Sequence, residues 1–220
     1  MDDRFGGVKT IFFDYDGCLH DSVRLYLPAF KKAYAYLVER GLAEHREWEE
    51  EEVTRWLGLN CHEMWETFQP GLEQSTRDEC MRIIKHAQKD LIEAGVAALY
   101  PGALETLAYL REKGYRLVFI SNCRKYYRDG HAAAFGLDRY FEELACSEDY
   151  GNAPKSEMLR QIKGRYPVEM AIVGDRRHDM EAGRKNGILT IGCAYGFARP
   201  GELDSADRII TNVAELRDIF

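Results

Sequence analysis

From residue 100 to the end of the chain, short apolar runs typical of strands alternate with stretches whose apolar residues recur at helical spacing. The first helix of this region is expected through Leu104, Leu107 and Leu110, and it ends at Gly114. Strands are expected at residues 117–120, 144–146, 170–173, 188–191 and 208–210. Strands separated by helices pair in parallel, with the connecting helices on both faces of the sheet. The chain is therefore predicted to have an α/β fold built on a parallel sheet.

One more apolar run, residues 8–13, comes directly before Asp14 and Asp16, and Gly17 follows them. In open α/β sheets, ligands bind at the carboxyl ends of the strands. Two carboxylates at such an end repel each other unless a cation or a shared proton separates them. One aspartate can then be a metal-bound nucleophile while the other transfers protons. A strand that ends in a solvated acidic turn is the alternative, since short motifs also occur by chance.

Polar residues occupy similar places later in the chain. Ser121 and Asn122 follow the run at 117–120, Asp175 and Asp179 follow the run at 170–173, and Lys155 lies between the two pairs. Taken singly, these residues have ordinary explanations, namely a turn, acids at a helix start and a solvated lysine. What distinguishes them is their order along the chain.

Strand-end Asp-x-Asp, strand-end Ser, a Lys and strand-end Gly-Asp-x-x-x-Asp, in this order, resemble the four motifs of the haloacid dehalogenase superfamily. Three further segments are similar to its phosphoglycolate-phosphatase-like branch: Tyr100-Pro101-Gly102, Ala182-Gly183 with Asn186-Gly187, and Tyr195-Gly196-Phe197. The resemblance implies a Rossmann-like core with three layers, α/β/α. It is thinnest between about residue 22 and residue 98.

The segment after Leu19 has a helical pattern up to about Ala98. An insertion between the first strand and the rest of the sheet emerges at the carboxyl edge, beside the acids, so residues 20–97 are predicted to form a helical cap and residues 1–19 and 98–220 the core. Residues 58–62 are expected to join helices at 49–57 and 63–68. In the family a loop at this place reaches the leaving group, which makes Asn60 and His62 candidate substrate contacts; a simple turn, with Gly58 ending a helix, is the alternative.

The resemblance also implies a role for each motif residue. Asp14 would be the nucleophile that forms an aspartyl-phosphate, and Asp16 would be the general acid and base. Mg²⁺ would bind the Asp14 and Asp175 carboxylates and the Asp16 backbone carbonyl. Asp179 would orient a metal-bound water or hold Lys155, while Ser121, the backbone around Asn122 and Lys155 would hold the phosphoryl group.

Several neighbouring residues carry weaker signals. The family's usual Thr is replaced by Cys18, which leaves the loop geometry and the sensitivity to oxidation open. His178 is expected at the surface because Mg²⁺ prefers oxygen ligands. Arg124 and Arg176 follow motif ends, where they either contact an anionic substrate or, as is commoner for arginine, stay solvated.

The composition excludes other classes of protein. With 30 basic and 37 acidic residues the net charge is −7, which argues against a nucleic-acid or anionic-membrane surface. No stretch approaches the length of a membrane span, the acidic start is unlike a signal peptide, and six scattered cysteines are typical of reduced thiols. A cytoplasmic monomer or homodimer that binds a small phosphorylated metabolite is expected.

These features predict a Mg²⁺-dependent phosphatase acting on a small phosphate monoester, with phosphoglycolate as the first candidate substrate. The second carboxylate, Asp16, favours phosphoryl chemistry over halide release, which needs no proton. A phosphomutase or a pyrophosphatase of the same fold remains open. A phosphometabolite sensor without catalysis is the alternative from another class, although the intact motif residues argue against it.

Overall fold

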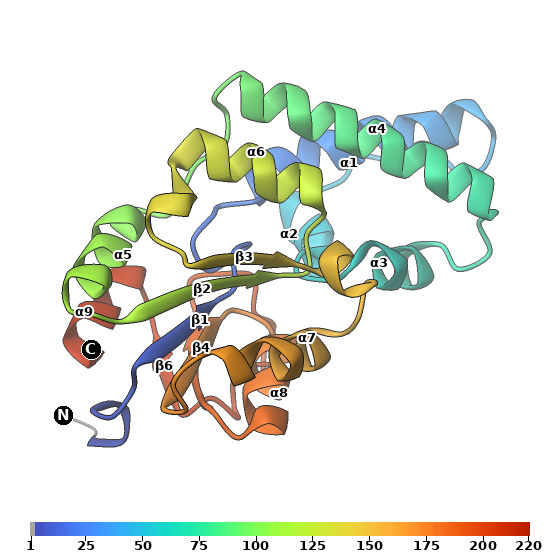
Figure 1. The fold of residues 1–220 in the computed structure, drawn as a ribbon. Helices are drawn as coiled ribbons and strands as arrows, with labels where there is room; N and C mark the ends of the chain where they lie inside the picture. Colours follow the sequence, from blue (N-terminus) through green and yellow to red (C-terminus); the bar gives the residue numbers. More distant parts are fainter. Residues whose placement is uncertain (1–2) are drawn as a thin grey trace.

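The computed structural model describes residues 3–220, which form a parallel sheet flanked by helices and a group of helices beside it (Figure 1). The six strands lie in the order β3-β2-β1-β4-β5-β6, and every neighbouring pair is parallel. Their bounds are β1 Thr10–Phe13, β2 Arg116–Ser121, β3 Glu143–Cys146, β4 Met170–Gly174, β5 Leu189–Cys193 and β6 Arg208–Ile210. The predicted parallel α/β fold is confirmed.

Helices cover both faces of the sheet, because neighbouring residues of each buried strand point to opposite faces. In β1, Ile11 and Phe13 pack on one face with residues of α5 (Ala103–Glu112), α6 (Lys125–Phe135) and α9 (Leu216–Ile219). On the other face, Phe12 packs with residues of α7 (Lys155–Ile162) and α8 (Arg177–Asn186). Figure 1 shows α6 on the side of the sheet opposite to α7 and α8. Helices are needed on both faces, since fully buried strands such as β1 expose neither face to water.

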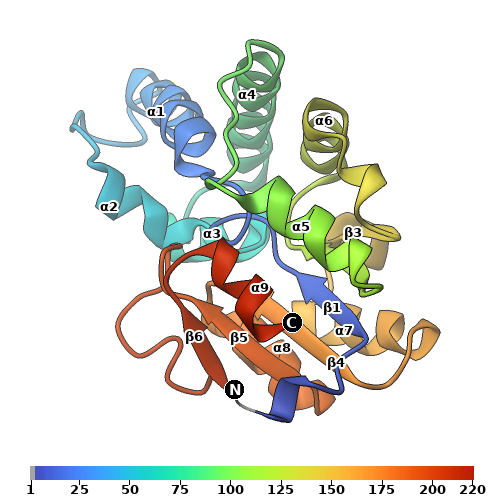
Figure 2. The same ribbon diagram turned by 90° about the vertical axis from the view of Figure 1, so that its left-hand side faces the viewer.

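Between β1 and β2 the chain forms a helical segment with a hydrophobic core of its own. Its helices are α1 Val23–Glu39, α2 Glu50–Val53, α3 Cys61–Phe68 and α4 Gln74–Glu93. In α1, Leu25, Ala29, Ala33 and Leu37 recur every four residues and are buried on one face. Figure 2 shows α1 and α4 standing away from the sheet, beyond the end at which α3 lies.

The connection between α2 and α3 is shorter than predicted. A 3₁₀ turn at Thr54–Trp56 continues α2, and α3 begins at Cys61 rather than at residue 63. Asn60 is the reason, because its side chain accepts a hydrogen bond from the backbone N–H of Glu63 while Glu63 accepts one from the backbone of Asn60. This reciprocal cap starts the helix directly after Asn60 and places His62 within its first turn.

No helix within residues 3–220 is both long and apolar enough to cross a membrane.

Candidate active site

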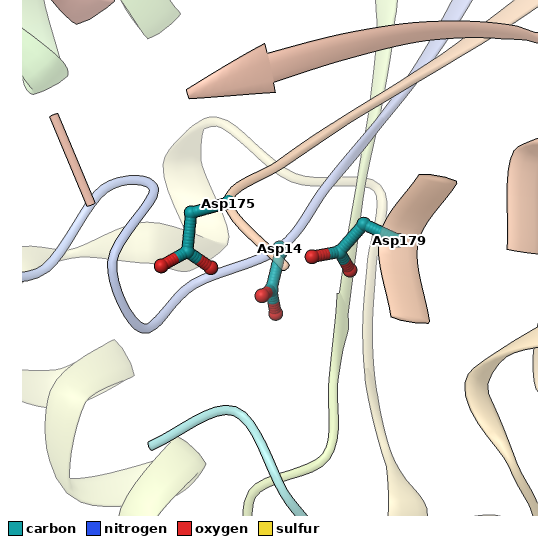
Figure 3. Close-up of side chains that lie close together, drawn as sticks. All are labelled: Asp14, Asp175 and Asp179. Atoms are coloured by element: carbon teal, nitrogen blue, oxygen red, sulfur yellow. The ribbon is translucent and has the colours of Figure 1, made fainter. Parts of the chain in front are cut away.

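The carboxyl ends of the neighbouring strands β1 and β4 bring three acidic side chains together (Figure 3). Asp14 follows β1, Asp175 follows β4, and Asp179 lies in the first turn of α8. One carboxylate oxygen from each lies within 4.8 Å of the others, and none of the three residues is more than 2% exposed. Figure 3 shows Asp14 between the other two. Residues 161 positions apart in the sequence (175 − 14) therefore share one buried site.

Lys155 supplies a positive charge at this cluster. It begins α7, is 3% exposed, and its Nζ lies 2.8 Å from Oδ1 of Asp14 and 2.5 Å from Oδ1 of Asp179. The other oxygen of Asp179 accepts a hydrogen bond of 2.9 Å from the backbone N–H of Arg176. Of the two roles that the family resemblance implies for Asp179, these contacts support holding Lys155.

The buried acids carry more negative charge than Lys155 balances. Burial, together with the charge of Asp179, raises the pKa of Asp14 to about 7, although Lys155 opposes the shift. Burial and then the Asp14 charge raise the pKa of Asp175 well above its usual range. Oδ2 of Asp14 and Oδ1 of Asp175 are buried without any hydrogen-bond partner. Unpartnered buried carboxylate oxygens on neighbouring strands are the donor set that Mg²⁺ prefers, so the residues present fit this ion.

Two glycine-containing loops close around Asp175. The backbone N–H of Phe197 donates a hydrogen bond of 2.6 Å to its Oδ2. Gly17 has a φ of +77°, which side chains rarely allow, and a Cβ added there would lie 2.5 Å from Cγ of Asp175. At Gly196 an added Cβ would lie 2.5 Å from Cβ of Asp175. The close approach of both backbones explains why glycine stands at each position.

Asp16 points to a separate group of buried polar side chains that the sequence did not reveal. Its Oδ1 accepts a hydrogen bond of 2.9 Å from the Tyr127 hydroxyl and lies 3.4 Å from Nδ1 of His20. Both partners are buried. Burial alone would raise the pKa of Asp16, but the hydrogen bond and charge of His20 lower it. No sequence pattern links Tyr127 to Asp16, because the two residues lie 111 positions apart.

A cavity at the edge of the sheet is lined by Asp14 and Asp16, by Ser121 and by Asn122. The Ser121 hydroxyl oxygen accepts a hydrogen bond of 3.2 Å from the backbone N–H of Cys123. The Asn122 side chain donates one of 2.9 Å to the carbonyl of Gly58, in the helical segment. The structure thus places these two predicted residues in the same cavity as Asp14 and Asp16. The Asn122 side-chain amide is already hydrogen-bonded to the helical segment.

The two other candidate substrate residues are not part of this lining. Asn60 caps α3, and His62 is exposed on the first turn of that helix. Their neighbours Gly58, Leu59 and Cys61 line the cavity instead. The cap at Asn60 explains the difference, since it turns this stretch into the start of a helix.

The structure contradicts the surface position expected for His178 and the solvated alternative for Arg176. His178 is half-buried, and its Nδ1 has no hydrogen-bond partner; burial and then the nearby Lys155 charge lower its pKa. Arg176 is 4% exposed. Its Nε donates a hydrogen bond of 2.8 Å to Glu202, and its guanidinium also donates one to the carbonyl of Leu57. Arg176 lies where the helical segment meets the core, which removes it from water.

The family model described as haloacid dehalogenase-like hydrolase matches residues 11–193. The chain belongs to this family. A phosphoglycolate phosphatase of Haemophilus influenzae (strain KW20) is 30% identical over 229 residues, which cover 96% of this chain and 98% of the relative. Pyrophosphatase PpaX of Bacillus pumilus is 24% identical over 86% of this chain and 85% of its own length.

Solved structures show the same fold. CbbY from Rhodobacter sphaeroides, in complex with phosphate, superposes with a TM-score of 0.79 at 22% identity and covers 95% of this chain and 96% of its own. A haloacid dehalogenase-like family protein from Streptococcus pneumoniae superposes with a TM-score of 0.78 at 22% identity. The match covers 95% of this chain and 96% of that protein. The matches confirm the resemblance to the phosphoglycolate-phosphatase-like branch of the superfamily, and the interpretation of the chain as a phosphatase enzyme.

Proposed function

We propose that this enzyme uses Mg²⁺ and an aspartyl-phosphate at Asp14 to hydrolyse the phosphate monoester of a small metabolite. The observation that carries the proposal is the pair of unpartnered oxygens on Asp14 and Asp175, buried beside Lys155. The relatives' names supply phosphoglycolate and pyrophosphate as the first substrates to test.

In the proposed reaction an oxygen of Asp14 attacks phosphorus, the new Asp14–phosphorus bond forms, and the bond to the leaving oxygen breaks. The leaving oxygen takes a proton from the Asp16 carboxyl group. Water then attacks phosphorus, the bond to Asp14 breaks, and Asp16 accepts the proton of the water. The lowered pKa of Asp16 describes the substrate-free protein; a bound phosphate dianion opposes this shift by like-charge repulsion.

The groups around the phosphoryl oxygens offset their charge. Mg²⁺, held by Asp14, Asp175 and the backbone carbonyl of Asp16, would supply charge stabilisation for the transferring phosphoryl group. Lys155 adds a fixed positive charge, because two acids hold its Nζ. Ser121 and Asn122 line the cavity together with Asp14 and Asp16, where the Ser121 hydroxyl and the backbone at Asn122 would donate to the phosphoryl oxygens.

We propose further that residues 20–97 act as a cap on a core made of residues 1–19 and 98–220. The loop after the 3₁₀ turn supports this, since Asn122 donates to the carbonyl of Gly58 and Arg176 donates to that of Leu57. Gly58 has a φ of +83°, and a Cβ there would lie 2.9 Å from Cγ of Arg176. These contacts hold the loop against the core, where Gly58 and Leu59 line the cavity together with Asp14 and Asp16.

The proposal is tested with purified protein, Mg²⁺ and a panel of phosphate esters that includes acetyl phosphate and phosphoglycolate. Turnover should stop after thorough chelation and return with Mg²⁺. Borohydride trapping and peptide mass analysis should locate the phosphoryl group on Asp14. Labelling of another residue, or activity that survives chelation, would contradict the mechanism.

Tyr127→Phe is expected to lower kcat about tenfold for an alkyl phosphate, because the Tyr127 hydroxyl holds the Asp16 oxygen that must meet the leaving group. An aryl phosphate needs little protonation, so its loss should be smaller. Steady-state kinetics with both substrates measure the difference. Tyr115→Phe is the matched control, since the Tyr115 hydroxyl donates to the carbonyl of Phe220, away from the site. Equal losses with both substrates would argue against a positioning role for Tyr127.

A further inference from the structure

Much of the cavity lining is an apolar and aromatic wall. It is formed by Trp56, Met64, Met81 and Ile84 from the helical segment and by Tyr126 from α6. The cavity has a volume of about 120 Å³. A cavity of about 150 Å³ lined by apolar side chains holds one benzene ring. This volume includes the part of the cavity lined by Asp14, Asp16 and Ser121, so the whole cavity is on the scale of a single small ring.

This wall offers no unpaired positive charge. Among the residues between 3 and 220 that line the cavity, Arg124 is the one lysine or arginine. Its guanidinium is already paired with Glu148, at 2.9 Å from Nε and 2.8 Å from Nη2. Its remaining terminal nitrogen, Nη1, lies 3.6 Å from the Met81 sulfur, so a carboxylate or a second phosphate on the leaving group would meet a cation whose charge Glu148 already offsets. Burying such a charge without a partner is costly.

Two neutral polar groups interrupt the apolar wall. Tyr26, on α1, is 9% exposed, and its hydroxyl is buried without a hydrogen-bond partner. Gln88, on α4, is 7% exposed, and its Oε1 accepts a hydrogen bond of 2.7 Å from the Tyr126 hydroxyl. Buried polar groups are nearly always hydrogen-bonded, so the Tyr26 hydroxyl lacks a partner that a bound molecule would provide. Both residues line the cavity, and because Gln88 Oε1 is already engaged, the Tyr26 hydroxyl is the one of these two groups without a partner.

We propose that the leaving group of the physiological substrate is an uncharged alcohol no larger than about one ring, bearing a hydroxyl or carbonyl group that meets Tyr26. The inference rests on the proposed phosphatase function and narrows it: the cavity favours a neutral ring alcohol over glycolate, whose carboxylate finds no free cation there. The phosphoryl group is bound at the acids in either case, so the preference lies in the leaving group alone.

Three benzylic esters isolate this effect: benzyl phosphate, 4-(hydroxymethyl)benzyl phosphate and 4-carboxybenzyl phosphate. Their reacting oxygens are chemically alike, and they differ in the group that reaches the far wall. We expect kcat/KM for the hydroxymethyl ester to exceed that for the carboxy ester by about tenfold or more. Phosphoglycolate should fall below benzyl phosphate. In Tyr26→Phe, the ratio of kcat/KM for the hydroxymethyl ester to that for benzyl phosphate should fall by about fivefold. The reason is that the hydroxyl group that distinguishes the two esters has been removed from the protein.

Glu148→Gln provides the reverse test, since it frees the Arg124 guanidinium. The ratio of kcat/KM for the carboxy ester to that for benzyl phosphate should rise about fivefold. Glu157→Gln removes a similar carboxylate paired with Arg160 on the outer side of α7, and it should leave the ratio unchanged. Equal kcat/KM for the three esters, or a preference for the carboxy ester in the unaltered protein, would overturn the proposed leaving group. If acetyl phosphate is still hydrolysed in that case, the proposed phosphatase function stands. Absence of Mg²⁺-dependent turnover of every ester and of acetyl phosphate would overturn both.

Discussion

Asp14→Asn is expected to lower kcat by about 10³-fold or more while the protein stays folded. An amide is a poor nucleophile and a weak ligand for Mg²⁺, so the substitution removes both proposed roles of the side chain. Its size is conserved, and Lys155 keeps Asp179 as a partner at 2.5 Å. Because Asp14 is buried against two other acids, loss of its charge should leave thermal stability in the absence of metal unchanged or slightly higher. Steady-state kinetics, circular dichroism and thermal unfolding measure the three quantities.

Asp138→Asn is the matched control, because Asp138 is exposed and lies outside the cavity lining. It should retain the activity of the unaltered protein. Turnover of Asp14→Asn within about tenfold of that protein, equivalent to about 1.4 kcal/mol in the barrier, would rule out Asp14 as the nucleophile.

Lys155→Met is expected to reduce both activity and stability, which separates it from Asp14→Asn. The substitution leaves Asp14 and Asp179 buried without their shared counter-charge. Removing one partner from a buried ion pair typically costs about 3 kcal/mol or more in the free energy of unfolding. Activity should fall about 100-fold or more, since the phosphoryl oxygens lose a fixed positive charge. Denaturant unfolding in the presence of a chelator measures the stability change without a contribution from Mg²⁺.

A double variant tests whether the unpaired buried charges cause the loss of stability in Lys155→Met. Lys155→Met with Asp179→Asn should recover much of the lost stability, because one unpaired charge is removed, but it should not recover activity. Lys185→Met, in which a surface lysine pairs with Glu181 at 3.3 Å, should change stability by less than about 0.5 kcal/mol. If Lys155→Met is as stable as this control, the buried pairs do not contribute as described.

The strand positions and the acids at their ends follow from local sequence patterns. Fully buried strands such as β1 and β4 are continuous apolar runs, and a parallel arrangement brings their carboxyl ends to one edge. Asp14 and Asp175 could therefore be predicted to meet without coordinates. Lys155 has no pattern of its own and was identified through its order among the motifs. Its contacts with Asp14 and Asp179 come from the start of α7 packing beside that edge.

The sequence by itself determined the parallel α/β fold and the edge where the acids gather, because periodicity and strand-end position are properties of neighbouring residues. Only the tertiary structure decided which side chains surround them. Tyr127 reaches Asp16 across 111 positions, and the wall with Tyr26 and Gln88 forms where α1, α4 and α6 meet. The cap at Asn60 joins residues only three positions apart, yet its consequence, that Leu59 and Cys61 line the cavity while His62 stays exposed, depends on how α3 packs. Packing between helices that are distant in the chain determines these contacts, and such packing cannot be predicted from a local sequence pattern.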